Sequence, residues 1–382
     1  MSVRETDTAK LGHVSTARGP EVASRVGIVL GVAILICFCT GLLSHWIQHP
    51  PSWFWWPAHP VWLYRVTQGA HVISGVAAIP LLLVKLWAVY PKLFQRPLIG
   101  SPLRALERGS IALLVGAILF ELVTGLLNIA QYYPWKFFFP TAHYAMAFVA
   151  VGALAVHLAV KLPVIRDALS RPLELAESAD AGGRRHVSRR AVLTAAWVSA
   201  GAASLVVAGQ TVPFLRWAAV LAPRSGEGPQ GLPVNRSATA AGVVDRARDL
   251  AYRLTVVVGD RRRQFTRDEL LAMPQTHARL PIACVEGWSA SAEWTGVRLR
   301  DLLAAVGAYP GGDVLFRSLE TSGIYRSSVL PQRHAVDAET LVALSLNGET
   351  LDIDHGYPCR LIAPSRPGVL QTKWLSTIEV LP

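Results

Sequence analysis

Five long apolar runs constrain the fold of this chain more than any other feature of its sequence. They lie near residues 26–46, 64–86, 109–128, 141–161 and 191–213. A helix rises about 1.5 Å per residue, so roughly 20 apolar residues cross a hydrocarbon core of roughly 30 Å. Every run reaches that length. The sequence therefore predicts an α-helical membrane bundle of five transmembrane helices, followed by a polar region that needs a fold of its own.

The connections between these runs alternate sharply in charge. The N-terminus and the second and fourth connections together hold 16 Lys and Arg residues, whereas the opposite side holds only Arg65, Lys136 and Arg216. Basic residues are enriched on the cytoplasmic side of a membrane. The pattern therefore predicts a multi-pass protein of a bacterial cytoplasmic (inner) membrane, with the N-terminus inside and everything after residue 213 outside.

The distribution of charge also limits the partners. The formal net charge is +11, of which residues 1–222 contribute +10 and residues 223–382 contribute +1. The basic excess thus lies in the apolar half, where membrane topology explains it. We expect a lipid membrane as a partner and no nucleic acid.

Changes in composition divide the chain into six segments. They are a cytoplasmic N-terminus (1–25), a four-helix membrane domain (26–162), a basic cytoplasmic loop (163–190), a fifth transmembrane helix (191–213), a linker (214–233) and an extracytoplasmic domain (234–382). The fifth helix follows Ser188-Arg189-Arg190, which resembles a twin-arginine export signal. Ordinary positive-inside arginines are the alternative. We expect this helix to remain as an anchor.

Three histidines within the apolar runs are candidate metal ligands, because ionisable side chains inside membranes are costly and usually functional. His143 and His157 are 14 residues apart, which places them within roughly 40° on one helix face and about 21 Å apart along the axis. His71 lies near the outer end of the second run. Imidazoles from two facing helices can hold a haem. Polar contacts between helices are the alternative, and for His157 the two alternatives weigh equally.

This histidine pattern resembles that of the four-helix b-type cytochrome subunits of respiratory formate dehydrogenases. The resemblance implies that His71 and His143 hold an outer haem b. The first helix of that family also supplies a ligand, but here its start reads Arg25-Val26-Gly27-Ile28. The resemblance therefore implies one haem, or two if His157 finds another partner.

Two further polar residues of the membrane half have open roles. His45, at the outer end of the first run, is a reserve haem ligand or a residue of a quinone site. Glu121 is the one acidic residue inside a predicted span. It is either a proton acceptor for a quinol or a partner for a helix-end amide or a water pocket.

Residues 234–382 alternate short β-rich runs with helical pieces, a pattern typical of a mixed α+β domain. We expect strands at 254–258, 314–317, 360–363 and 375–380, and helices at 266–273 and 298–306. Cys284 leaves a further strand and is followed by Glu286 and Trp288. A soft thiolate in this place suits a soft or high-valent metal, and the spacing around it is not that of a zinc site. A buried structural cysteine and a Cys284–Cys359 disulfide are the alternatives.

The run 284–289 and its sequel at 293–303 resemble the molybdopterin-binding domain of the sulfite oxidase family. The likeness continues in order through 323–325, 354–361 and 368–375. It comes closest to the branch that includes the catalytic subunit of the periplasmic methionine-sulfoxide reductase. The resemblance implies a sulfite-oxidase-type fold that binds molybdopterin, the molybdenum cofactor.

The same resemblance implies a role for particular side chains. Cys284 would ligate molybdenum, and Glu286 would lie beside the open metal position as a second catalytic residue. The cofactor-binding residues would be Asn235, Arg236 and His355 at the pterin, and Arg360 and Lys373 at its phosphate. Cationic donors suit a phosphate, whereas ordinary surface cations are the alternative. An acidic Glu286 also disfavours the anion sulfite as substrate.

Together these features predict a membrane-bound molybdenum-cofactor oxidoreductase. It would transfer an oxygen atom to or from a small-molecule or protein-borne oxo-substrate, and a fused haem b would exchange the electrons with the quinone pool. The alternative is a membrane-anchored haem electron-transfer or binding protein whose outer domain lacks molybdenum and is not catalytic.

Overall fold

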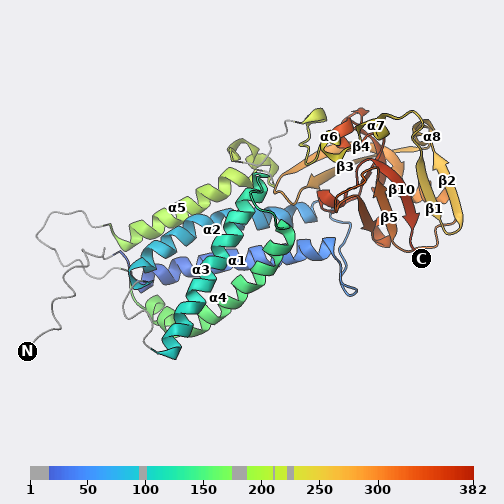
Figure 1. Ribbon diagram of the computed structural model, residues 1–382. Helices are drawn as coiled ribbons and strands as arrows, with labels where there is room; N and C mark the ends of the chain where they lie inside the picture. Colours follow the sequence, from blue (N-terminus) through green and yellow to red (C-terminus); the bar gives the residue numbers. More distant parts are fainter. Residues whose placement is uncertain (1–16, 94–100, 174–186, 210, 222–227) are drawn as a thin grey trace, which may run out of the picture. The chain divides into compact units, whose positions relative to one another are not determined.

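The computed structural model describes residues 17–93, 101–173, 187–209, 211–221 and 228–382 (Figure 1). The chain divides into two compact units. Residues 1–41 and 70–207 form a helical unit, whereas residues 42–69 and 208–382 form a second unit that contains the β-sheets. Residues 1–16 of the predicted N-terminus, 174–186 of the basic loop and 222–227 of the linker lie outside the described residues.

Long helices dominate the N-terminal half of the chain. They are α1 (Pro20–Gln48), α2 (Leu63–Leu93), α3 (Pro102–Ile129), α4 (Phe139–Ser170) and α5 (Arg189–Ala208). Within the described residues, these five are long and apolar enough to cross a membrane. The five predicted apolar helices are therefore confirmed as helices. Helices α1 to α4 extend beyond their predicted limits, whereas α5 ends at Ala208 instead of residue 213.

The helical unit buries many alanines among larger apolar side chains and leaves further large apolar side chains exposed on its outside. Its buried core includes Ala33, Ala78, Ala117, Ala150 and Ala196. Small residues allow close approach of helices where no water drives them together. On the outside, Val32 is 51% exposed and Leu83 is 61% exposed. This inverted distribution suits a surface that meets lipid rather than water.

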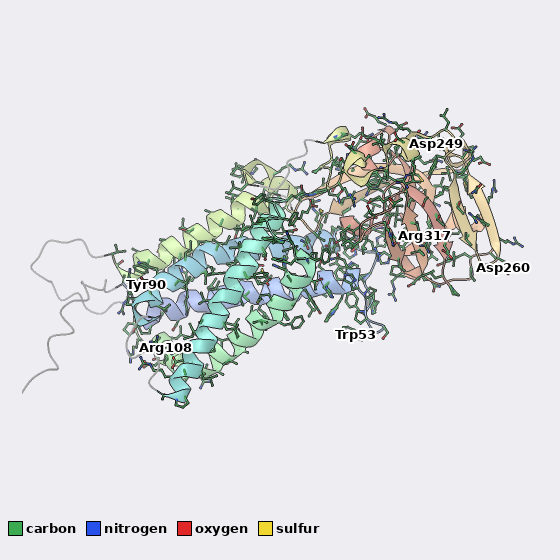
Figure 2. The ribbon with its side chains drawn as sticks, in the orientation of Figure 1. Trp53, Tyr90, Arg108, Asp249, Asp260 and Arg317 are labelled. Atoms are coloured by element: carbon green, nitrogen blue, oxygen red, sulfur yellow. The ribbon has the colours of Figure 1, made fainter. Side chains whose placement is uncertain are left out.

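Ion pairs connect the helices at the end of the unit where α1, α3 and α5 begin. Glu21 of α1 pairs with Arg189 of α5 at 3.3 Å, and Glu107 of α3 pairs with Lys161 of α4. Arg108, at the start of α3, lies at the same end of this unit as Tyr90 (Figure 2). Arg189 of the twin-arginine pair is thus engaged within the bundle.

The first sheet of the second unit has the strand order β2-β1-β10-β5-β6. Its strands are β1 (Leu254–Val258), β2 (Arg261–Phe265), β5 (Val314–Ser318), β6 (Ser327–Leu330) and β10 (Leu375–Val380). Strands β1 and β10 pair in parallel, and the other neighbours are antiparallel. The capping box of Thr266 and Glu269 starts helix α8 (Arg267–Ala272) directly after β2.

The second sheet carries the long hairpin that positions the candidate site. It contains β3 (Gln275–Ala283), β4 (Ser289–Arg298), β7 (Leu341–Leu346), β8 (Glu349–Thr350) and β9 (Arg360–Ile362). Strands β3 and β4 pair from Gln275↔Val297 to Ala283↔Ser289. Short helices complete the unit: α6 (Ala238–Ala241), α7 (Val244–Arg248), α9 (Leu299–Ala304), α10 (Gln332–Ala335), η1 (Pro213–Ala218), η2 (Pro229–Gly231), η3 (Ile353–His355) and η4 (Gly368–Leu370). The expected sheet-containing C-terminal domain is confirmed.

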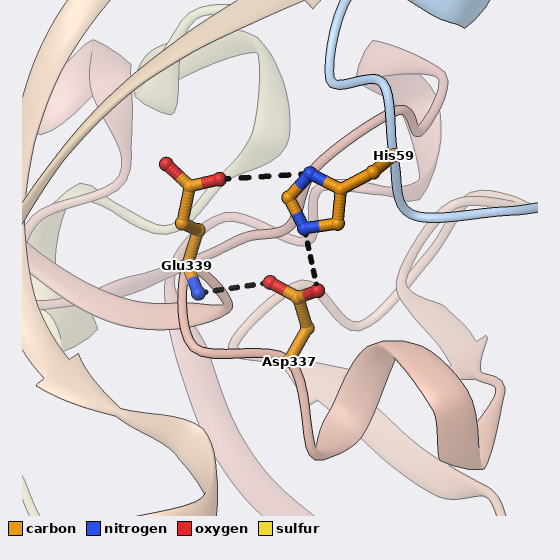
Figure 3. A group of neighbouring side chains, drawn as sticks. All are labelled: His59, Asp337 and Glu339. Carbon is orange, nitrogen blue, oxygen red and sulfur yellow. Dashed lines mark hydrogen bonds and ion pairs between the residues drawn. The ribbon is translucent and has the colours of Figure 1, made fainter.

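The connection between α1 and α2 packs on this second unit. The indole Nε1 of Trp56 donates to the carbonyl oxygen of Ser365 at 2.8 Å. His59 lies between two carboxylates, with Nε2 2.8 Å from Asp337 and Nδ1 3.9 Å from Glu339 (Figure 3). By contrast, Trp53 in the same connection is 65% exposed (Figure 2). The proline- and tryptophan-rich connection is therefore a structural part of the sheet-containing unit.

We predict that Gly296→Ala destabilises the second unit by about 1–3 kcal/mol, the usual cost of overpacking. A Cβ at Gly296 would lie 2.6 Å from the Cα of Ala343 and closer still to the carbonyl oxygen of Val342, where β4 pairs with β7. The thermal unfolding midpoint, followed by β-sheet circular dichroism in detergent, measures the effect.

The matched control is Gly259→Asn, at a β-turn with φ of +58° and open space around the position. Asparagine tolerates this left-handed conformation, so the control should change the midpoint little. Equal midpoints for both variants would contradict the close approach of β4 and β7.

Candidate functional site

Cys284 lies in the tight turn that joins β3 to β4. Its backbone N–H donates to the carbonyl oxygen of Trp288 at 2.8 Å, and the N–H of Gly287 donates back to the carbonyl oxygen of Cys284 at 3.1 Å. Gly287 has φ of +92°, a conformation that glycine adopts without steric cost. Cys284 is only 1% exposed. The turn thus presents its thiol to the interior instead of to solvent.

The turn forms one wall of a hollow with roughly 320 Å³ of open space, part of it continuous with solvent. The walls come from segments far apart in the sequence: Leu232, Pro233, Asn235, Ile282, Cys284, Trp288, His355, Arg360, Gly368 and Lys373. Five of the seven side chains singled out in the sulfite-oxidase-type region therefore meet here: Asn235, Cys284, His355, Arg360 and Lys373. The structure thus brings most of the predicted site together.

Arg360 is a buried cation whose partners are all neutral. It is 4% exposed, and its guanidinium donates to the carbonyl oxygens of His355 at 3.0 Å and Gln371 at 3.1 Å. The guanidinium also lies 5.1 Å from the ring centroid of Trp294. Burial lowers the pKa of Arg360 to about 9.

Lys373 is the second buried cation of the hollow. Its ammonium donates to the carbonyl oxygens of Arg236 at 2.5 Å and Asp354 at 2.9 Å, and to Oδ1 of Asn235 at 3.3 Å. Burial, and next the nearby charge of Arg360, lower the pKa of Lys373 to about 7. Among the described residues, no carboxylate forms an ion pair with Lys373 or Arg360. Two such cations facing one hollow favour an anionic ligand.

A glycine brings these two cations close together. Gly356 has φ of +109°, and a Cβ there would lie 3.0 Å from the Cβ of Arg360 and 3.2 Å from that of Lys373. A larger residue would push the two side chains apart. The glycine in the 354–361 run is thus explained by close approach as well as by backbone conformation.

His355 and Asn235 supply neutral polar groups to the same hollow. Nε2 of His355 lies 2.7 Å from the carbonyl oxygen of Pro229, so this nitrogen carries the proton. Burial lowers the pKa of His355 to about 4, which keeps the ring neutral with Nδ1 as an acceptor. Oδ1 of Asn235 accepts from the backbone N–H of Arg236 and from Lys373. The hollow therefore offers donors and acceptors as well as positive charge.

Two predicted site residues do not line the hollow. The Arg236 side chain pairs with Glu320 at 2.7 Å, and only its carbonyl oxygen reaches Lys373. Glu286 lies in the turn after Cys284 and accepts a bond from Nε1 of Trp288 at 3.1 Å. Tyr325 lies near this turn, since burial, and then the proximity of Cys284 and Glu286, raise its pKa.

Neither Cys284 nor Cys359 forms a disulfide in this structure. Cys359 lies in a hydrophobic core together with side chains of β1, β5 and β10, whereas Cys284 belongs to a different core. The Cys359 thiol is 3.2 Å from the hydroxyl of Tyr252. Burial raises the pKa of Cys359 to about 12, as expected for a structural cysteine. The structure therefore gives no support to a Cys284–Cys359 disulfide.

In the helical unit, the imidazoles of His71 and His143 face each other. Their ring centroids are 6.4 Å apart at an interplanar angle of 67°. Nδ1 of His71 donates to the carbonyl oxygen of Cys37 at 2.9 Å, which leaves Nε2 available as a ligand atom. Nδ1 of His143 lies 3.1 Å from the hydroxyl of Thr124.

Glu121 is part of this histidine pair. One of its carboxylate oxygens lies 3.0 Å from Nε2 of His143, and the other is buried without a hydrogen-bond partner. Of the roles that the sequence left open, the structure shows a side-chain partner rather than a helix-end amide. His45 instead lies beside His49, with ring centroids 5.0 Å apart and the ring planes tilted by 48°.

His157 has a different environment. Its electrostatic neighbours are Lys85, Lys161 and Glu107. The ammonium of Lys85 donates to the carbonyl oxygen of Ala23 at 2.7 Å. His71, His143 and His157 are the only histidines in the described part of the helical unit, and the structure does not pair His157 with another imidazole there.

Sequence reasoning missed the contribution of residues at the start of α2. Arg65 donates to the hydroxyl of Ser291 at 3.1 Å, and Gln68 donates to the carbonyl oxygen of Val285 at 3.3 Å. Both contacts reach the β3–β4 hairpin that carries Cys284. Their position at the edge of an apolar run gave no signal of this, because polar residues are ordinary at the ends of membrane helices.

Comparison with known proteins agrees with this geometry. Residues 241–382 match the family described as the oxidoreductase molybdopterin binding domain. The sulfite oxidase of Arabidopsis thaliana is 28% identical over 172 residues, which cover 36% of this chain and 44% of that protein. The putative protein-methionine-sulfoxide reductase subunit YedZ1 of Azospira oryzae is 33% identical over 132 residues, covering 34% of this chain and 49% of that protein.

The chain thus spans less than half the length of each of these relatives. The solved structure of the sulfane dehydrogenase SoxCD from Paracoccus pantotrophus aligns with 26% identity and a TM-score of 0.32, over 34% of this chain and 38% of that chain. The family match and these relatives support a molybdopterin-binding oxidoreductase domain within residues 241–382 that is similar to that of the sulfite oxidases.

We predict that Lys373 makes the cofactor-free protein less stable at neutral pH than at alkaline pH. Its pKa is about 7 when folded, against an ordinary value of 10.5, so between these values the unfolded chain binds more protons. Stability contributed by this group therefore rises with pH across that window.

The test compares denaturant midpoints of wild-type and Lys373→Met protein, both without cofactor, at pH 7 and pH 10. The variant should be the more stable at pH 7, and the difference should shrink at pH 10. If the difference between the two midpoints were the same at pH 7 and pH 10, protonation of Lys373 would not destabilise the folded protein, and the prediction would be wrong.

Proposed function

We propose that this protein is a membrane-bound molybdenum-cofactor oxidoreductase that transfers oxygen atoms and exchanges electrons with the quinone pool through haem b. The observation that carries the proposal is the meeting of Cys284, Arg360 and Lys373 in one hollow of a domain that matches a molybdopterin-binding family. The proposed substrate is a neutral oxo-compound, either a small molecule or a group on a protein. The histidine pair of the helical unit supports the proposed transfer of electrons through haem b.

The residues of the hollow fit an anionic, metal-bearing pterin. Arg360 and Lys373 are buried cations without a carboxylate partner among the described residues, and a phosphate would supply the missing negative charge. Asn235 and the neutral ring of His355 would hydrogen-bond the polar edges of the pterin. When bound, the cofactor supplies the two-electron oxygen-atom chemistry.

The remaining residues prepare that chemistry. The thiolate of Cys284 would ligate molybdenum from the β3–β4 turn, where its backbone is held by Trp288. The bond from Trp288 to Glu286 fixes the carboxylate beside this turn, where it would take up or release a proton during turnover. A carboxylate in this place repels anions, which favours neutral oxo-compounds over sulfite.

The histidine pair of the helical unit fits a haem. If His71 and His143 held a haem, a metal–imidazole bond of roughly 2 Å on each side and an imidazole radius of about 1.2 Å would separate the two ring centroids by roughly 6.4 Å. The observed 6.4 Å between His71 and His143 agrees with that value. Ligation would require Glu121 to release Nε2 of His143. The freed carboxylate would then be available for proton exchange with a quinol.

A single haem is the simpler proposal. His157 has Lys85, Lys161 and Glu107 as neighbours, and two cations beside a ligand position disfavour a ferric centre electrostatically. We place the N-terminus in the cytoplasm and the molybdopterin domain outside the bacterial inner membrane, as the distribution of basic residues supports.

Cys284→Ser should abolish turnover and leave the haem spectrum intact, because the thiolate and the haem ligands lie in different units. We expect one molybdenum and one iron per chain in detergent-purified wild-type protein by elemental analysis. If wild-type protein from a host that makes the cofactor contained iron but no molybdenum, the proposed activity would be refuted. Loss of haem in Cys284→Ser would refute the separation of the two centres.

His71→Ala and His143→Ala should each lose the haem Soret band while molybdenum is retained. His157→Ala is the matched control and should keep the full band, since it removes an imidazole from the same helix as His143. The readouts are the absorbance per chain and the molybdenum content. Two irons per wild-type chain, or haem loss in His157→Ala, would reveal a second haem.

A further inference from the structure

The start of α2 reaches the backbone on both sides of Cys284. Tyr64, 1% exposed, packs in one buried cluster with Ala283 and Leu370. Ala283 directly precedes Cys284, and Leu370 belongs to η4, the segment that includes Gly368 of the hollow. The first turn of α2 thus covers the base of the turn that bears the thiol.

Gln68 holds the other side of the same turn. It is 7% exposed, and its Nε2 donates to the carbonyl oxygen of Val285, the residue after Cys284, at 3.3 Å. The hydroxyl of Tyr64 lies 3.5 Å from Oε1 of Gln68 and 3.0 Å from the hydroxyl of Ser44. The amide of Gln68 is therefore oriented by Tyr64 one turn earlier in α2, with its N–H group toward the Cys284 turn.

Arg65 holds the hairpin further along β4. It is 8% exposed, and Nη1 donates to the hydroxyl of Ser291 at 3.1 Å. Ser291 lies in β4, opposite Pro281 of β3. The start of α2 therefore holds the hairpin within β4 as well as at its turn.

We propose that Arg65 and Gln68 are positioning residues that hold the Cys284 turn against the hollow through Ser291 and the Val285 carbonyl. This inference rests on the proposed function, in which Cys284 ligates molybdenum. A ligand needs support from residues whose own conformations are fixed. Here that support comes from a segment more than 200 residues earlier in the chain.

The first test measures the thiol in cofactor-free full-length protein, from a host that does not make the cofactor. Alkylation of Cys284, mapped by mass spectrometry, should be about tenfold faster in Gln68→Ala and in Arg65→Met, because the turn opens more often. Arg65→Met keeps an apolar stem for packing. The alkylation rate of Cys359, which is buried in a different hydrophobic core from Cys284, serves as the internal reference.

Gln48→Ala is the matched control. Gln48 ends α1, and its amide donates to Ser44 of the same helix, so the Cys284 rate should equal that of wild type. Unchanged Cys284 rates in Gln68→Ala and Arg65→Met would overturn the inference. Faster labelling of Cys359 as well would mean that the whole domain opens, and would equally overturn a local role.

The second test uses cofactor-loaded protein and separates positioning from general stability. In Gln68→Ala, turnover should fall by about tenfold to a hundredfold, the scale expected for a reacting group that is misplaced. The paramagnetic molybdenum signal should change while molybdenum per chain stays constant. If Gln68→Ala loses molybdenum, Gln68→Glu replaces it in this test. Glutamate keeps the size of the side chain but replaces the N–H donor with an acceptor, so turnover should fall and the paramagnetic signal should change in the same way.

The two proposals fail in different ways. Wild-type protein without molybdenum would remove the proposed function itself. Wild-type protein with molybdenum and turnover, matched by Gln68→Ala and Gln68→Glu in rate and in paramagnetic signal, would leave the proposed function standing and refute only the positioning role of α2.

Discussion

Burial of two cations without carboxylate partners is the constraint on which the candidate site depends. Arg360 and Lys373 point their charge at one hollow and satisfy their N–H groups with neutral oxygens. A buried charge without a counter-ion is costly, which the lowered pKa of each group reflects. Gly356 adds to the cost by bringing the two together. An arrangement that destabilises the empty domain makes sense where an anion completes it.

Much of the sheet-containing unit was predictable where the signal is local. The runs 254–258 and 375–380 are rich in β-branched residues and form β1 and β10 as expected. Strand β2 was missed because its sequence, Arg261–Phe265, is mostly charged, as an exposed edge strand can be. The Cys284 turn and the residues around Arg360 lie within short motifs, so their meeting could be anticipated from the resemblance. The side chain of Arg236 could not be placed, because its partner Glu320 is distant in sequence.

Contacts made across long sequence separations set the limit of such prediction. Gln68 reads as a polar residue at the edge of a membrane helix, and nothing in the run 64–86 indicates that its amide meets Val285. Similarly, the spacing of histidines indicated a helix face but not that Glu121 would occupy Nε2 of His143. Periodicity reports which way a side chain points relative to its own helix. Periodicity does not indicate which residue of a neighbouring element the side chain contacts.

The placement of β10 has a consequence for the order of assembly. This strand is the last of its sheet in the chain, yet it lies between β1 and β5, and Lys373 comes two residues before it. A nascent chain therefore cannot close this sheet, or complete the anion-binding wall, until β10 has emerged. Arg65 and Gln68 at the start of α2, by contrast, are made more than 300 residues earlier. The β3–β4 hairpin, when it emerges, therefore meets supporting residues that are already synthesised.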